Sequence, residues 1–110
     1  MTRAPLALLL SLLAASCGGE AGGGAAPRSH LVEMRTFAFA PAELTVAEGD
    51  TVVWRNADIL PHTATAAGTF DSGSVPAGGE WRWVATAGDF AYLCTFHPTM
   101  KGVLTVTPRG

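Results

Sequence analysis

The stretch Cys94-Thr95-Phe96-His97-Pro98-Thr99-Met100, near the end of the chain, carries the strongest information about the fold and its chemistry. It holds a thiol, an imidazole and a thioether at regular spacing, and a second imidazole lies well upstream. One thiolate and two histidines around a metal, with a weak axial methionine, form the ligand set of a blue-copper electron-transfer site. The predicted ligands of a single copper ion, cycling between Cu(I) and Cu(II), are therefore His62, Cys94, His97 and Met100.

Each of these residues also has an ordinary structural interpretation when taken alone. His62 could be a loop histidine, Cys94 a buried strand thiol and Met100 a filler of the core. A catalytic thiol–imidazole pair would need an orienting third group and a substrate cleft, which a small sandwich hardly provides. Zinc prefers thiolates or histidines and does not recruit methionine. The combination favours copper, and no enzymatic activity is expected.

Outside the ligand stretch, turn residues separate short segments in which apolar and polar residues alternate. Val52 and Trp54 alternate with Thr51, Val53 and Arg55, and Trp81 and Trp83 alternate with Glu80 and Arg82. This pattern predicts an all-β protein, a Greek-key β-sandwich of about seven to eight strands. The strands expected are 31–39, 44–46, 51–56, 62–66, 80–85, 89–94 and 103–107. Met34 is expected to pack in the core, and His30 to be an exposed bystander.

The N-terminus reads as an export signal, residues 1–17. Arg3 gives a positive start, an apolar run follows, and Leu13-Ala14-Ala15-Ser16-Cys17 resembles a bacterial lipobox, although ordinary cleavage is the alternative. We expect Cys17 to be acylated, residues 18–29 to form a flexible Gly/Ala-rich tether, and the folded domain to span 30–108. The protein would then be exported, periplasmic or at the cell surface, and attached to the membrane by lipid.

The two cysteines and the charge balance exclude other classes. With Cys17 in the lipobox, Cys94 is the single thiol of the domain, so no internal disulfide is expected. An immunoglobulin fold, which Tyr92 two residues before Cys94 could suggest, would need a second early cysteine, and 30–72 contains none. The net charge of −2 and the lack of a basic run argue against binding to nucleic acid.

With ligands and strands placed, nearly the whole domain resembles a cupredoxin of the amicyanin, plastocyanin and pseudoazurin kind. The matching segments are Phe39-Ala40-Pro41-Ala42-Glu43-Leu44-Thr45-Val46, Glu48-Gly49-Asp50-Thr51-Val52-Val53-Trp54-Arg55-Asn56, Leu60-Pro61-His62, Gly88-Asp89-Phe90-Ala91-Tyr92-Leu93-Cys94 and His97-Pro98-Thr99-Met100-Lys101-Gly102. The two-residue gaps on either side of the second histidine resemble amicyanin. Two positions depart from the family: Thr63 stands where asparagine often ties the ligand loops together, and Phe96 stands where amicyanin has proline.

The resemblance implies a monomeric type 1 copper protein that carries single electrons between a protein donor and a protein acceptor. It also implies that the second histidine reaches the surface within an apolar patch, which we expect to consist of Leu60, Pro61, Phe96 and Pro98. The alternative function keeps the copper but changes the role, to a scavenging or copper-delivery module. Such modules usually hold copper on exposed methionine and histidine clusters, and the tether contains none.

Overall fold

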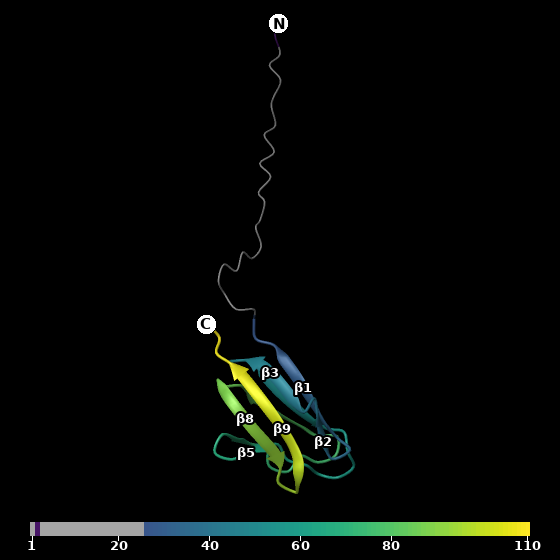
Figure 1. The fold of residues 1–110 in the computed structure, drawn as a ribbon. Coiled ribbons are helices and arrows are strands. Elements are labelled where there is room, and N and C mark those ends of the chain that lie inside the picture. The colour runs from purple at the N-terminus through teal and green to yellow at the C-terminus, as the bar shows by residue number, and fades with distance from the viewer. Residues whose placement is uncertain (1, 3–25) are drawn as a thin grey trace.

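The structure, a computed structural model, describes residue 2 and residues 26–110, and every regular element within this part of the chain is a β-strand. The strands form two sheets that pack face to face (Figure 1). The all-β sandwich predicted from the sequence is confirmed. The strands are β1 Ser29–Arg35, β2 Ala38–Ala40, β3 Glu43–Ala47, β4 Thr51–Asn56, β5 Thr65–Ala66, β6 Phe70–Asp71, β7 Glu80–Val84, β8 Gly88–Cys94 and β9 His97–Thr107.

Both sheets are mixed, because each contains one parallel pair. The four-stranded sheet has the order β2-β1-β4-β7, with β1 and β4 parallel. The five-stranded sheet has the order β3-β9-β8-β5-β6, with β3 and β9 parallel. The remaining neighbours run antiparallel. Among the described residues there are nine strands, against the seven to eight expected, because one predicted strand splits and one short strand was missed.

Three predicted strand boundaries were wrong. The segment 31–39 is a hairpin that turns at Thr36 and Phe37, where no glycine, asparagine or proline marks a turn, and Met34 and Phe39 are cross-strand partners in the core. The segment 62–66 keeps only β5, while His62 forms an isolated bridge to Val75. Strand β9 begins at His97 instead of 103, so the second part of the ligand stretch is strand and not loop.

The core lies between the two sheets and is centred on Trp54, which is fully buried on β4. Met34 packs there as expected, and the rings of Phe70 and Tyr92 lie 5.2 and 5.5 Å from the Trp54 ring. Burial of a large apolar side chain stabilises a fold by roughly 1.5–3 kcal/mol. This aromatic centre therefore supplies much of the rigidity on which the strand ends depend.

Residues from the two ends of the described domain, Arg28 and Arg109, meet at one pole of the sandwich through Asp50, which lies in the turn before β4. The buried Asp50 carboxylate accepts hydrogen bonds from the Arg28 amide at 2.9 Å and from Arg109 Nη2 at 2.6 Å, and lies 2.9 Å from His30 Nε2. The expectation that His30 is a bystander was therefore wrong. Figure 1 places the C-terminus at this pole, away from the β8–β9 connection.

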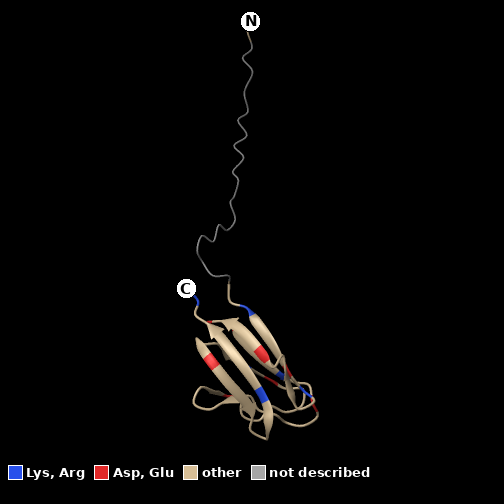
Figure 2. Ribbon diagram, in the orientation of Figure 1, with Lys and Arg blue, Asp and Glu red and all other residues tan. Residues whose placement is uncertain are grey.

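Charges of both signs are interspersed over the described strands (Figure 2). Opposite charges also pair locally, as in Arg82 with Glu80 on β7, 3.0 Å apart. No helix in the described part of the chain is long and apolar enough to cross a membrane.

Candidate metal centre

The pole opposite the chain ends is built by the connection between β8 and β9. Cys94 is the last residue of β8 and pairs with His97, the first residue of β9, across a register irregularity after Leu93. This short turn brings the thiol and the imidazole to the same place although neither residue is in a long loop. Cys94 is fully buried, whereas His97 is partly exposed.

The loop before His62 brings the second imidazole to the same pole, and Asn56 organises that loop. The buried Asn56 amide donates to the carbonyl oxygens of Leu60 at 2.8 Å and Val75 at 3.0 Å, and its oxygen accepts the Asp58 amide at 2.9 Å. The backbone of His62 is held by two hydrogen bonds with Val75. These contacts fix a loop that periodicity in the sequence cannot predict.

The three strongest predicted ligands converge as a metal site requires. Cys94 Sγ lies 3.7 Å from His62 Nδ1 and 3.7 Å from His97 Nδ1, and all three atoms lie within 4.8 Å of one another. In a trigonal site with bonds of about 2.3 Å to sulfur and about 2.0 Å to nitrogen, the sulfur would lie about 3.7 Å from each nitrogen. The observed spacing therefore fits one copper ion held by His62, Cys94 and His97.

The fourth predicted ligand, Met100, lies on β9 three residues after His97 and is 2% exposed. It belongs to the same buried cluster as Cys94. Its burial is equally compatible with packing, so its role as axial ligand rests on the sequence spacing.

Thr63 ties the two ligand segments together even though it departs from the family's usual asparagine. Its amide donates to Cys94 Sγ at 3.3 Å, and its hydroxyl oxygen accepts the Thr95 amide at 2.8 Å. The Thr63 amide therefore fixes the position of the sulfur, and the Thr63 hydroxyl fixes the residue that follows it. The smaller hydroxyl of Thr63 therefore cross-links the two ligand segments in place of an asparagine side chain.

Asp58 contacts the site and was not identified from the sequence. Its Oδ2 lies 2.7 Å from His62 Nε2, so the ring donates its proton there and leaves Nδ1 free to face Cys94. Partial burial opposes ionisation, but hydrogen bonds from the Thr36 amide, the His62 ring and the Phe37 amide together lower the pKa of Asp58. A carboxylate four residues before a predicted ligand histidine was the available signal.

The residues of the predicted apolar patch are all exposed. Leu60 is 44% and Phe96 50% exposed, and Pro61 and Pro98 are exposed as well. Phe37, which the sequence placed in a strand, contacts both imidazoles edge-on, with its ring centre 5.7 Å from that of His62 and 4.9 Å from that of His97.

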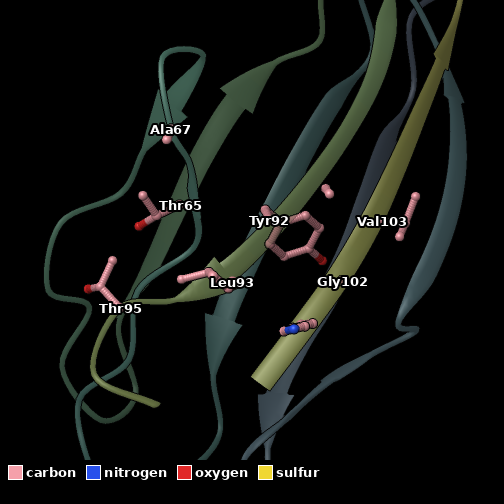
Figure 3. A pocket seen from close by; sticks show the side chains of 9 residues that line it. Thr65, Ala67, Tyr92, Leu93, Thr95, Gly102 and Val103 are labelled. Carbon is pink, nitrogen blue, oxygen red and sulfur yellow. The ribbon is translucent and has the colours of Figure 1, made fainter. Parts of the chain in front are cut away.

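A separate hollow lies against β5, β8 and β9, bordered by residues that include Thr65, Leu93 and Val103 (Figure 3). Its lining is almost wholly apolar and contains none of the four predicted copper ligands. The hollow is therefore distinct from the metal centre.

Comparison with models of protein families and with curated proteins found no match. Solved structures do match. A methionine-to-alanine variant of amicyanin with Cu(I) is 27% identical, with a TM-score of 0.65, over 71% of this chain and 81% of that one. A proline-to-phenylalanine variant of amicyanin in its reduced state is 29% identical, with a TM-score of 0.64, over the same shares. The copper-containing nitrite reductase of Thermus scotoductus is 26% identical, with a TM-score of 0.65, over 74% of this chain but only 22% of the enzyme.

The fold and the converging ligands define the class: the chain has the cupredoxin fold, with three ligands that fit a type 1 copper site. Within that class it is similar to amicyanin along most of the length of both chains. The nitrite reductase shares the domain but has most of its chain elsewhere.

Proposed function

We propose that this protein is a type 1 copper protein that carries single electrons between exported redox partners. The observation that carries the proposal is the convergence of His62 Nδ1, Cys94 Sγ and His97 Nδ1, with the sulfur 3.7 Å from each nitrogen. The likeness to amicyanin supports the carrier role, and the small share of nitrite reductase that is matched gives no support for an enzymatic one. We further propose that the domain acts as a monomer, with no reaction of its own.

In such a site, four residues of the chain would bind the copper and a fifth would hold the binding segments in place. Bound copper supplies a one-electron couple in which Cu(I) favours soft sulfur and Cu(II) favours nitrogen. Cys94 offers the thiolate, the two histidines offer nitrogen, and Met100 is proposed as the weak axial ligand. Thr63 holds the two ligand segments together, so the donors need move little between the two states.

Partner docking is proposed at the exposed apolar residues next to the ligands. Leu60 and Pro61 precede His62, and Phe96 and Pro98 flank His97, and all four are exposed. An apolar contact of modest area allows close approach and rapid release, which a carrier needs. A charged residue in place of Leu60 or Phe96 should slow electron exchange with a partner while leaving the visible spectrum unchanged.

The delivery alternative predicts loose, accessible copper. Here His62 and Cys94 are fully buried, which favours retention over hand-over. A competition assay with a Cu(I) chelator distinguishes the two functions. Slow release of copper to the chelator supports the electron carrier, and release within the mixing time supports copper delivery.

The copper assignment itself is tested by the spectrum of the copper-loaded chain. The oxidised protein should be intensely blue, because the Cys94 thiolate bonds covalently to Cu(II). Cys94→Ala should abolish the band and keep the β-sheet signal in circular dichroism. Thr99→Ala, an exposed residue in the same stretch, is the matched control and should stay blue. A colourless copper-loaded wild type refutes the assignment.

For the N-terminal part we propose export with a signal at 1–17, acylation at Cys17 and a tether over 18–29; Cys17 lies outside the described residues. The first strand starts at the pole opposite the ligand turn, which supports an arrangement in which an anchored domain presents its copper pole away from the membrane. Mass spectrometry should find acyl chains at Cys17, and Cys17→Ser should remove them. A free Cys17 thiol in the wild type contradicts this.

A further inference from the structure

The turn between β1 and β2 has a conformation that its own residues disfavour. Thr36 and Phe37 form a two-residue hairpin turn with φ angles of 54° and 56°. Hairpin turns with positive φ at both central residues favour Asn-Gly, whereas a β-branched or bulky residue is an outlier there. Local preference therefore does not explain this turn, and something outside it must hold it in place.

The Asp58 carboxylate holds the turn from the neighbouring loop. Its Oδ1 accepts the Thr36 amide at 2.7 Å, and its Oδ2 accepts the Phe37 amide at 3.2 Å. The same Oδ2 lies 2.7 Å from His62 Nε2. One carboxylate thus binds both central amides of a strained turn and orients a buried ligand histidine.

The strained turn places an aromatic ring against the ligands. The Phe37 ring meets the His62 ring at 85° and the His97 ring at 79°, both in the edge-on geometry that aromatic rings favour. Half of Phe37 remains exposed. One part of the ring therefore faces the two imidazoles, and the rest faces solvent.

We propose that Phe37 is a cover that keeps water from the ligand set, and that Asp58 is the positioning residue that fixes this cover and the His62 ring together. Backbone strain that persists only because surrounding contacts enforce it is typical of functional positions. Excluding water strengthens the electrostatic interactions of a site and protects its thiolate. The purpose of the cover rests on the proposed copper function. The cover itself can be tested in the protein without copper.

The first test measures access to the Cys94 thiol in the full chain before copper loading, with iodoacetamide as the probe. Phe37→Gly removes the ring while suiting the positive φ, so the turn need not unfold. We expect alkylation of Cys94 at least about tenfold faster, which corresponds to about 1.4 kcal/mol of closing free energy. Phe37→Leu keeps an apolar cover and should stay within about twofold of wild type. Ile59→Ala is the matched control, since Ile59 is an apolar residue near the same pole that is 92% exposed.

The second test separates the role of Asp58 in holding the turn from the role of Phe37 in covering the ligands. Asp58→Asn should speed amide exchange at Thr36 and Phe37, measured by NMR, and should speed Cys94 alkylation as well. Asp71→Asn is the control, because Asp71 also accepts a backbone amide, that of Gly73, without touching a ligand histidine. In the copper-loaded protein, both Phe37→Gly and Asp58→Asn should release Cu(I) to a chelator faster than their controls.

An unchanged alkylation rate in Phe37→Gly overturns the cover, and protected turn amides in Asp58→Asn overturn the holding role. Both readouts work without copper. A wild type that fails to turn blue would therefore refute the proposed function while leaving this inference standing on the thiol and amide data. Conversely, a blue protein with an unaltered alkylation rate in Phe37→Gly would refute the cover alone.

Discussion

The close contact between Gly102 and Tyr92 gives the sharpest prediction about this fold, for the substitution Gly102→Ala. The two residues are cross-strand partners on β9 and β8. A Cβ at Gly102 would lie 2.3 Å from Tyr92 Cζ and 2.5 Å from its Oη, whereas ordinary contacts are 3.4–4 Å. The ring would have to move by about 1 Å or more, yet it is 4% exposed and packs against Phe39 and Trp54.

The expected cost follows from overpacking. Extra methyl groups in a filled core cost about 1–3 kcal/mol. For a domain of this size each kcal/mol lowers Tm by about 4–8 °C, so a fall of about 4–24 °C is expected. Tyrosine is neutral near pH 7, and burial raises the pKa of Tyr92 further, to about 12, so the penalty is steric. Because Met100 lies two residues before Gly102, the blue band should also shift.

Urea unfolding at constant m-value measures this cost. Gly79→Ala is the milder control, since its Cβ would lie 3.1 Å from Pro76 atoms and neither glycine has a positive φ. Adding Tyr92→Leu to Gly102→Ala should recover part of the loss, giving a non-additive double-mutant cycle. A Gly102→Ala variant within about 0.5 kcal/mol of wild type would refute the packing argument.

Three further outcomes are expected. Met100→Gln should lower the reduction potential, because a harder donor favours Cu(II), and Met100→Leu should raise it; unchanged potentials by voltammetry would exclude an axial role. Hydrogen bonds from the Arg28 amide and the His30 ring hold the pKa of Asp50 well below its usual range. The stability advantage of wild type over Asp50→Asn should therefore be full above about pH 4 and shrink on further acidification, and urea unfolding that shows the advantage growing would contradict this. Removing copper should lower Tm in calorimetry, since metal bound only by the folded state stabilises it, and an equal Tm would count against a preformed site.

The sequence was sufficient for the fold class because period-2 alternation and turn residues both indicated strands. It was also sufficient to single out three residues whose side chains converge, since Cys94 and His97 are joined by a turn too short to separate them, and His62 lies in a segment that resembles the family. Strand boundaries were harder to predict. The hairpin turn at Thr36 and Phe37 contains no glycine, asparagine or proline, so the residues that usually mark a turn are missing there.

The contacts that organise the ligands could not be predicted in the same way, because they join segments far apart in the chain. Asn56 supports the His62 loop through Val75, and Asp58 reaches back to Thr36. Neither contact has a periodicity or a fixed spacing in the sequence. Thr63, which departs from the family's usual asparagine, also joins the two ligand segments, through its hydroxyl oxygen.

The structure also explains how a small domain can hold a soft thiolate ready for metal without a disulfide or a long loop. The Thr63 amide donates a hydrogen bond to Cys94 Sγ, and the imidazoles of His62 and His97 converge on the same sulfur from separate elements. Each imidazole is constrained on a second side, His62 by Asp58 and both rings by Phe37. The turn that carries Phe37 costs roughly 1–2 kcal/mol per strained residue, a substantial part of the net stability of a domain this size. The fold can tolerate this cost because the aromatic core and the contacts of Asp50 stabilise the rest of the sandwich. The strained residues Thr36 and Phe37 lie at the pole where the ligands meet.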